Sequence, residues 1–181
     1  SKKIKTLLDN YLRSDYKIKC RGTVLDLNAR THIMGILNIT PDSFSDGGRY
    51  LDTDRAAGRA REMAAQGADI IDIGGESTRP GAEPTPAEEQ MRRAIPVILA
   101  IRMRNSAVAI SIDTRAAAVA RAAVVAGADI VNDVSALRDD PDMADVVSAS
   151  GAAVVLMHRR GTSRDMQDGG GPHYDDVIAE I

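Results

Sequence analysis

The chain has 181 residues and a net charge of −3, with 44% apolar and 27% charged residues. This length and balance predict one globular domain with a substantial hydrophobic core. Lys and Arg are scattered, and no apolar run approaches the roughly 18 residues of a membrane span, so we expect neither a nucleic acid nor a membrane as partner. The single Cys20 excludes an internal disulfide framework and suits a cytoplasmic protein.

The first predicted elements precede the regular part of the pattern. Residues 3–14 carry apolar side chains at helical spacing, among them Ile4, Leu8 and Leu12, and predict a short amphipathic helix. Residues 16–27 alternate between apolar and polar around a central Arg-Gly pair. They predict a β-hairpin that caps one end of the domain.

From residue 32 onward, predicted strands and helices alternate. The strands cover residues 32–38, 68–73, 107–113, 128–132 and 152–157, and the helices between them cover 52–66, 87–104, 115–126 and 141–150. Glycines follow the first, third and fourth of these helices, as is typical of helix ends. The tetrapeptide Gly-Ala-Asp-Ile occurs at residues 67–70 and again at 127–130, which supports a repeated βα unit. Strands joined by crossover helices predict a parallel sheet.

Each predicted strand ends in a polar residue or a glycine-rich polar loop. These are Asn38, the segment 74–79, Asp113, Asn132 and His158. In a (β/α)₈ barrel, functional groups come from the carboxyl ends of several strands. A doubly wound sheet instead gathers its site at one switch point, usually with a Gly-rich phosphate turn, and this sequence has neither a GxGxxG nor a Walker motif. We therefore predict an α/β fold of the TIM-barrel type.

The number of strands is smaller than a whole barrel requires. A complete barrel takes about 250 residues and eight strands, and an open sheet of five strands would leave two edges unpaired. The last residues, 174–181, have the pattern of the opening turns of a helix. We expect residues 1–181 to form a single domain with about five βα units, truncated at its carboxyl end, with about three units missing.

Two loops that follow predicted strands hold chemically versatile side chains. The first begins at Asn38 and contains the chain's only phenylalanine, Phe44. In the second, Gly74-Gly75 allows close backbone approach, the hydroxyls of Ser77 and Thr78 follow, and Arg79 offers a planar fork for a phosphate or carboxylate. Ordinary strand-to-helix connections are the alternative interpretation.

Two further residues predict recognition of a heterocycle. The carboxylate of Asp113 is costly at a buried strand end unless it is paired, either with Arg115 or with N–H groups of a ligand. Asn132 offers both a donor and an acceptor at the parallel position. Together they suit a pterin or a purine, although both side chains could instead satisfy neighbouring backbone groups. A solitary histidine such as His158 is more often structural than catalytic.

An acidic cluster at Asp139, Asp140 and Asp142 has the composition of a metal site. Pro141 near a helix start provides another interpretation, because carboxylates there complement the helix dipole. We therefore expect the cluster to serve the helix that follows it.

Five motifs in order resemble the dihydropteroate synthase family. They are Met-Gly-Ile-Leu-Asn-Ile-Thr-Pro-Asp-Ser-Phe-Ser-Asp-Gly-Gly, Asp-Ile-Gly-Gly-Glu-Ser-Thr-Arg-Pro-Gly, Ser-Ile-Asp-Thr, Gly-Ala-Asp-Ile-Val-Asn-Asp-Val-Ser and Val-Leu-Met-His. The resemblance implies a (β/α)₈ transferase of folate biosynthesis that sulfonamides inhibit. That enzyme condenses 6-hydroxymethyl-7,8-dihydropterin diphosphate with p-aminobenzoate, giving 7,8-dihydropteroate and pyrophosphate. The family is commonly dimeric, so a homodimer is expected.

The resemblance also implies roles for individual residues. Asn38 would ligate Mg²⁺ near the diphosphate, and Thr78 and Arg79 would act with it at the reacting end of the substrate. Asp113 and Asn132 would read the pterin edge. The pterin slot would be lined by Ile36, Val134 and Met157, and the p-aminobenzoate pocket by Phe44, Ser77, Arg79 and Pro80. Mg²⁺ and Arg suit the charge of a leaving diphosphate, and the chemistry implied requires no protein nucleophile.

The sequence departs from the family pattern in two ways. The family's remaining pterin-pocket Asp and Lys and its Arg-x-His motif lie on the last three strands of the barrel, which are not among the five predicted here, so we expect the 181-residue segment alone to be inactive. Arg159-Arg160 replaces a usually uncharged pair, which would alter the mouth or oligomer contacts. A catalytically inactive pterin-binding paralogue is one alternative. A methyltetrahydrofolate methyltransferase domain is another, disfavoured because its reaction has no diphosphate for the two long loops to hold.

Overall fold

The computed structural model describes residues 2–20, 23–39, 49–76, 84–104, 107–159 and 173–180. The elements begin with α1 (Lys2–Tyr11), β1 (Lys17–Lys19), β2 (Val24–Asp26), β3 (Met34–Asn38), α2 (Arg49–Ala65) and β4 (Ile70–Gly74). They continue with α3 (Ala87–Met103), β5 (Ala109–Asp113), α4 (Ala117–Ala126), β6 (Ile130–Asp133), α5 (Met143–Ser150), β7 (Ala153–Leu156) and α6 (Val177–Glu180). Every element predicted from the sequence is present, with ends shifted by a few residues.

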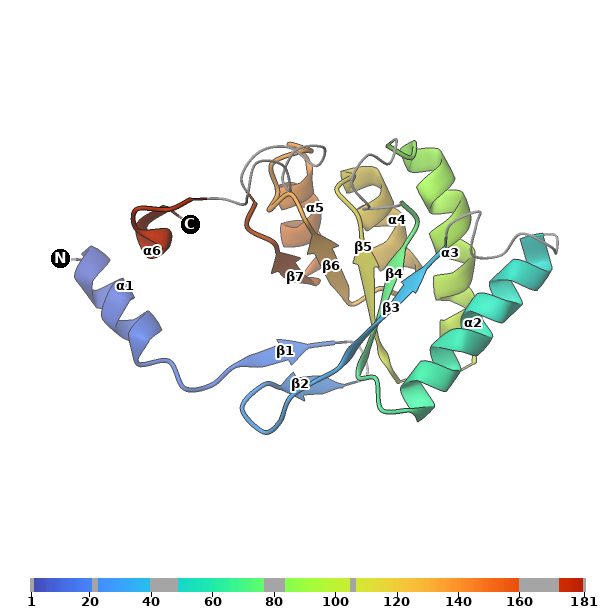
Figure 1. Ribbon diagram of the computed structural model, residues 1–181, viewed down its shortest axis with the longest axis horizontal. Coiled ribbons are helices and arrows are strands. Elements are labelled where there is room, and N and C mark those ends of the chain that lie inside the picture. Colours follow the sequence, from blue (N-terminus) through green and yellow to red (C-terminus); the bar gives the residue numbers. More distant parts are fainter. Residues whose placement is uncertain are drawn as a thin grey trace.

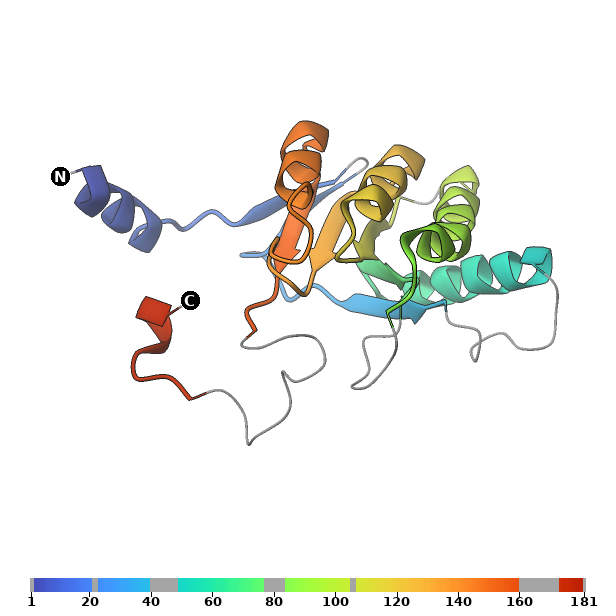
Figure 2. The same cartoon turned by 90° about the horizontal axis from the view of Figure 1, so that it is seen from above.

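The main sheet has five parallel strands in the order β3-β4-β5-β6-β7. Each consecutive pair of strands is joined by one of the helices α2 to α5, and these helices all lie on the same side of the sheet (Figure 1). Seen from above, the helices follow an arc outside the strands (Figure 2). This arrangement is part of a (β/α)₈ barrel, and the predicted α/β barrel class is confirmed.

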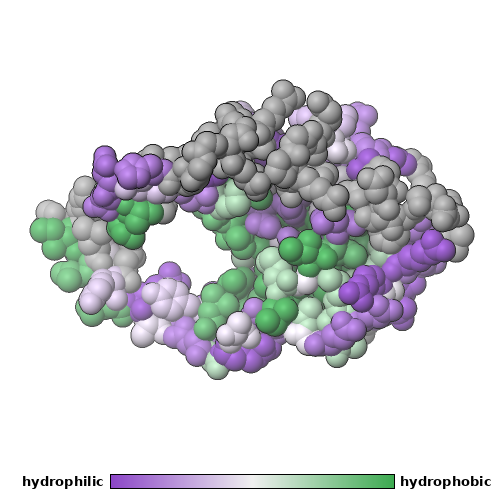
Figure 3. Space-filling view, viewed as in Figure 1, coloured by the Kyte–Doolittle hydropathy of each residue, from purple (hydrophilic) through white to green (hydrophobic). Residues whose placement is uncertain are grey.

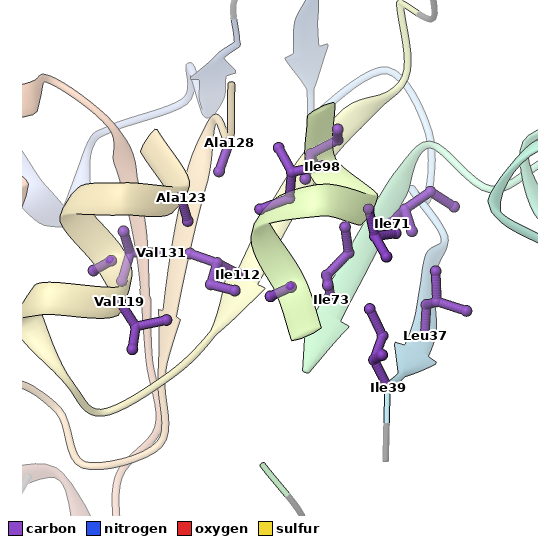
Figure 4. Close-up of a cluster of buried hydrophobic side chains, with 14 of the residues drawn as sticks. Leu37, Ile39, Ile71, Ile73, Ile98, Ile112, Val119, Ala123, Ala128 and Val131 are labelled. Atoms are coloured by element: carbon purple, nitrogen blue, oxygen red, sulfur yellow. The ribbon is translucent and has the colours of Figure 1, made fainter. Parts of the chain in front are cut away.

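The outer face of the sheet packs against the helices. Ile71, Ile73, Ile110 and Ile112 are completely buried there, together with Val97 and Ile98 of α3 (Figure 4). The helices themselves end as the sequence predicts: Gly67 and Gly127 adopt φ values of 106° and 122°, which side chains other than glycine rarely adopt. Burial of this face therefore fixes which residues of each strand point inward.

The inner face has its own apolar layer at the amino end of the strands. Ile70, Ala109 and Ile130 are buried there against Leu25 of the β1–β2 hairpin. The hairpin thus caps the amino end of the barrel interior, as predicted. The carboxyl end of the same face is left for polar groups.

The repeated Gly-Ala-Asp-Ile tetrapeptide builds the same contact twice. Asp69 Oδ2 accepts a hydrogen bond from Ile33 N at 2.9 Å, just before β3. Asp129 Oδ2 accepts one from Ile110 N, also at 2.9 Å, in β5. Each aspartate therefore ties the start of its own strand to the preceding one in the chain. Their arginine partners are Arg30 and Arg102.

Two helices lie apart from the sheet. α1 and α6 project at the left of Figure 1, and Figure 3 shows apolar side chains on both. Ile4, Leu8 and Tyr11 of α1 are 58%, 53% and 86% exposed. Within the described residues, no helix is long and apolar enough to cross a membrane.

Candidate active site

The register of the sheet brings distant polar residues into one row. Asn38 of β3 pairs with Gly74 of β4, Gly74 with Asp113 of β5, and Asp113 with Asn132 of β6. Side chains at paired positions project to the same face of a sheet. The row therefore lies at the carboxyl end of the inner face, where barrel enzymes place their functional groups.

Gly74 is the position that lets Asn38 approach the strand. A Cβ atom at Gly74 would lie 2.9 Å from Asn38 Oδ1 and 3.8 Å from Asp113 Oδ2. The first distance is shorter than real Cβ contacts allow, so a larger residue would displace the amide. Asn38 and Asp113 thus present an amide oxygen and a carboxylate around one small space.

Asn38 Oδ1 and Asp113 Oδ2 are oxygen ligands of the kind that coordinates Mg²⁺. Mg²⁺ is usually held by one or two protein oxygens together with water and substrate phosphates. Across the described part of the chain, no group of three or more His, Cys, Asp or Glu side chains is arranged to hold a metal ion. Asn38 and Asp113 fit the more open kind of site that a substrate completes.

A second row lies one layer deeper on the same face. It contains Asp72 of β4 and Ser111 of β5, which are register partners and are 4% and 0% exposed. Asn132 Nδ2 donates to Asp72 Oδ2 at 3.1 Å. Asp72 Oδ1 and Ser111 Oγ are buried without a hydrogen-bond partner among the described residues. Orphaned buried polar atoms are costly, so they identify a place where a ligand or water would be bound.

Asp72 was not predicted as a site residue from the sequence. A signal was present, because Ile70, Asp72 and Gly74 are two residues apart and so share one face of a strand. A carboxylate in the middle of an otherwise apolar strand is unfavourable in the core unless it is hydrogen-bonded.

Asp113 lies in an environment that favours its protonated form. Burial raises the pKa of this carboxyl to about 7, and the nearby charges of Asp72, Glu76 and Asp133 add to the shift. The charge of Arg115 opposes the shift, and Arg115 also forms ion pairs with Glu76 and Asp139. Pairing of Asp113 with a ligand therefore stays a prediction.

Arg115 links two acidic side chains, Glu76 and Asp139, at the outer rim of the site. Its Nη2 donates to both oxygens of Glu76, at 3.0 and 3.1 Å, and its Nη1 donates to Asp139 Oδ2 at 2.8 Å. Glu76 also accepts a hydrogen bond from Thr85 N at 3.1 Å. Glu76 was not predicted from the sequence either, since a glutamate after two glycines is not distinctive by itself.

The remaining predicted site residues fall into two groups. Ile36 is 65% exposed on the inner face, and Val134 and Met157 are half-buried after β6 and β7. Ile36 is the register partner of Asp72, and the roles of Val134 and Met157 stay predictions. The other predicted residues lie outside the described residues: Phe44, Ser77, Thr78, Arg79 and Pro80.

The acidic cluster and His158 have structural partners. Asp140 Oδ2 accepts a hydrogen bond from Ala117 N at 2.8 Å, at the start of α4, and Asp139 pairs with arginines. Asp140 Oδ1 also accepts a hydrogen bond from Asp142 N at 3.0 Å, directly before α5. The expectation that the cluster serves the following helix therefore holds for Asp140, which contacts the starts of both α4 and α5, but not for Asp139, which pairs with Arg115 and Arg159. His158 Nε2 lies 2.8 Å from the hydroxyl of Tyr174.

Comparison with known proteins identifies the family. A family model described as pterin binding enzyme matches residues 34–181. The chain belongs to the pterin-binding enzyme family. All five motifs that suggested the resemblance lie within the matched range, as does the row from Asn38 to Asn132.

Several similar proteins are named dihydropteroate synthases. The Synechocystis enzyme is 47% identical over 159 residues, which cover 88% of this chain and 54% of that protein. The Bacillus subtilis enzyme is 51% identical over 143 residues, covering 79% and 50%. The Xanthomonas albilineans dihydropteroate synthase with 4-aminobenzoic acid superposes with a TM-score of 0.76 at 47% identity, covering 92% of this chain and 57% of that one. The chain spans about half the length of the curated relatives it matches.

Proposed function

We propose that this chain provides the pterin-binding and diphosphate-binding part of a dihydropteroate synthase. The reaction would join 6-hydroxymethyl-7,8-dihydropterin diphosphate to p-aminobenzoate and release pyrophosphate. The observation that carries the proposal is the inner-face row of Asn38, Gly74, Asp113 and Asn132 above the buried Asp72. The relatives at 47–51% identity are named as enzymes of this reaction.

The pterin would lie against Asp113, Asn132 and the deeper Asp72. A pterin edge presents N–H donors beside nitrogen and oxygen acceptors, and these three side chains offer both kinds of group. Asp72 Oδ1 is a buried acceptor without a partner in the described structure, and Asp113 has a pKa of about 7. A ligand N–H would satisfy the first and would favour ionisation of the second.

The diphosphate would lie toward β3 and β4. Asn38 Oδ1, seated over Gly74, would hold Mg²⁺ there with Asp113 close by. A bound Mg²⁺ supplies charge that stabilises a leaving diphosphate. Thr78 and Arg79 would contact the same end of the substrate, and Phe44, Ser77, Arg79 and Pro80 would shape the p-aminobenzoate pocket. In the reaction, the C–O bond between the pterin methylene carbon and the diphosphate breaks, the amino nitrogen of p-aminobenzoate bonds to that carbon, and the nitrogen releases a proton.

Calorimetric titration with 6-hydroxymethylpterin diphosphate, with and without Mg²⁺, tests the proposal. We expect Mg²⁺ to strengthen binding of the diphosphate and to strengthen binding of pyrophosphate alone. A methyltransferase domain would bind a pterin without this linkage to Mg²⁺ and pyrophosphate. Binding of the pterin diphosphate without any turnover in the complete protein would identify an inactive paralogue. We also propose a homodimer, which sedimentation velocity would detect.

A further inference from the structure

A chain of alternating charges runs along the rim of the site. Its members come from four successive segments that follow strands: Glu76 after β4, Arg115 after β5, Asp139 after β6 and Arg159 after β7. Arg115 donates to Glu76 at 3.0 Å and to Asp139 at 2.8 Å. Arg159 Nη2 donates to the other oxygen of Asp139. Two anions and two cations thus form one neutral series, which we call the rim ion chain.

Both ends of the rim ion chain are buried. Glu76 is 7% exposed and Arg159 is 8% exposed. Removing one partner from a buried ion pair leaves an uncompensated charge, which destabilises far more than breaking an exposed pair. Arg159 is further positioned by Arg138, whose Nη2 donates to its backbone oxygen at 2.8 Å. Loss of one of these four side chains should therefore perturb the other members of the rim ion chain.

The Glu76 end is attached to the backbone that supports Asn38. Glu76 directly follows Gly74-Gly75, and Gly75 O accepts a hydrogen bond from Arg93 Nη1 at 3.0 Å. A Cβ atom at Gly75 would lie 3.0 Å from Gln90 O, so this backbone is seated closely on α3. Glu76 is thus joined through Gly75 to Gly74, the residue that lies beneath the amide of Asn38.

We propose that Arg159 is a positioning residue for the diphosphate end of the site. Acting through Asp139 and Arg115, it holds Glu76 and the Gly74-Gly75 backbone in place. A residue after β7 thereby sets the affinity for a group bound near β3 and β4, without touching it. The pterin end depends on Asp72, Asp113 and Asn132, none of which is a member of the rim ion chain. The inference rests on the proposed function.

The test compares dissociation constants of 6-hydroxymethylpterin and of its diphosphate with Mg²⁺. We expect Arg159→Met to weaken binding of the diphosphate about fivefold or more and to leave that of 6-hydroxymethylpterin within about twofold. Arg159→Lys should recover most of the loss, because an ammonium group can still pair with Asp139. Arg59→Met is the matched control, since Arg59 forms an exposed pair with Glu62 on α2. A purely structural defect would weaken both ligands alike.

Hydrogen exchange of the Thr85 amide gives a measurement that needs no ligand. This N–H donates to Glu76, so Arg159→Met should accelerate its exchange while Arg59→Met should not. An unchanged Thr85 amide in Arg159→Met, or equal weakening of both ligands, overturns the inference. If the unmodified protein binds neither ligand, the proposed function fails, and Thr85 exchange still decides whether the rim ion chain transmits a change.

Discussion

Asp72 and Asn132 meet inside the sheet although they are 60 residues apart: Asn132 Nδ2 donates to Asp72 Oδ2 at 3.1 Å. Asp72 is 4% exposed, and its second oxygen has no hydrogen-bond partner among the described residues. The pair therefore orients the amide of Asn132 and keeps one buried acceptor open. It defines the floor of the proposed pterin site.

Replacement of Asp72 tests its role in the proposed pterin site. Asp72→Asn keeps the size of the side chain but removes its charge, so we expect the affinity for 6-hydroxymethylpterin to fall about tenfold or more, as for loss of a charged hydrogen bond. The pKa of Asp113 should fall below about 7, because Asp72 is one of the like charges that raise it. Calorimetry and NMR titration measure the two effects. Asp54→Asn, in an exposed ion pair with Arg104, serves as the control and should change neither.

The raised pKa of Asp113 predicts a pH-dependent cost in stability. The carboxyl binds a proton more tightly in the folded state than in the unfolded state, where its pKa is near 3.8. Its contribution to the free energy of unfolding is therefore full below that value and is lost as the pH rises through about 7. Asp113→Asn should be more stable relative to the unmodified protein at pH 8 than at pH 4. Urea unfolding at the two pH values measures this, and an equal difference at both would contradict it.

Gly74→Ala tests the diphosphate end of the site separately from the pterin end. The new Cβ would lie 2.9 Å from Asn38 Oδ1 and would force that amide to move. We expect the gain in diphosphate affinity on adding Mg²⁺ to be lost, as calorimetry would show. Gly58→Ala is the matched control on α2, where the nearest atom to the new Cβ is Arg61 Nη2 at 3.9 Å. It should leave binding unchanged and stabilise the helix by about 0.5–1 kcal/mol.

The repeated Gly-Ala-Asp-Ile contacts predict unequal losses of stability. The pair of Arg102 with Asp129 is buried, with side chains 19% and 2% exposed, so Arg102→Met should lower the free energy of unfolding by about 3–5 kcal/mol. In the equivalent pair Arg30 is 58% exposed, and Arg30→Met should cost about 1 kcal/mol or less. Denaturant unfolding compares the two variants. Similar losses of unfolding free energy in the two variants would contradict the prediction that burial makes the Arg102–Asp129 pair the more important one.

Much of the fold was predictable because its signals are local. Apolar runs bounded by turn residues marked the strands, and glycines such as Gly67 and Gly127 marked helix ends with the backbone conformation that they adopt. The candidate site was less accessible. Asn38, Asp113 and Asn132 were predicted because each ends a strand, whereas Asp72 and Glu76 were missed because their partners lie far away in the sequence.

The sequence by itself determined the alternation of strands and helices, the family motifs, and the polar residues at the strand ends. Tertiary structure decided which of those residues share a row, since that depends on the register of hydrogen bonds between strands. It also decided that Arg115 pairs with Glu76 and Asp139. An ion pair depends on distance in space, and the separation of two loops across a curved sheet is set by the packing of the whole barrel wall.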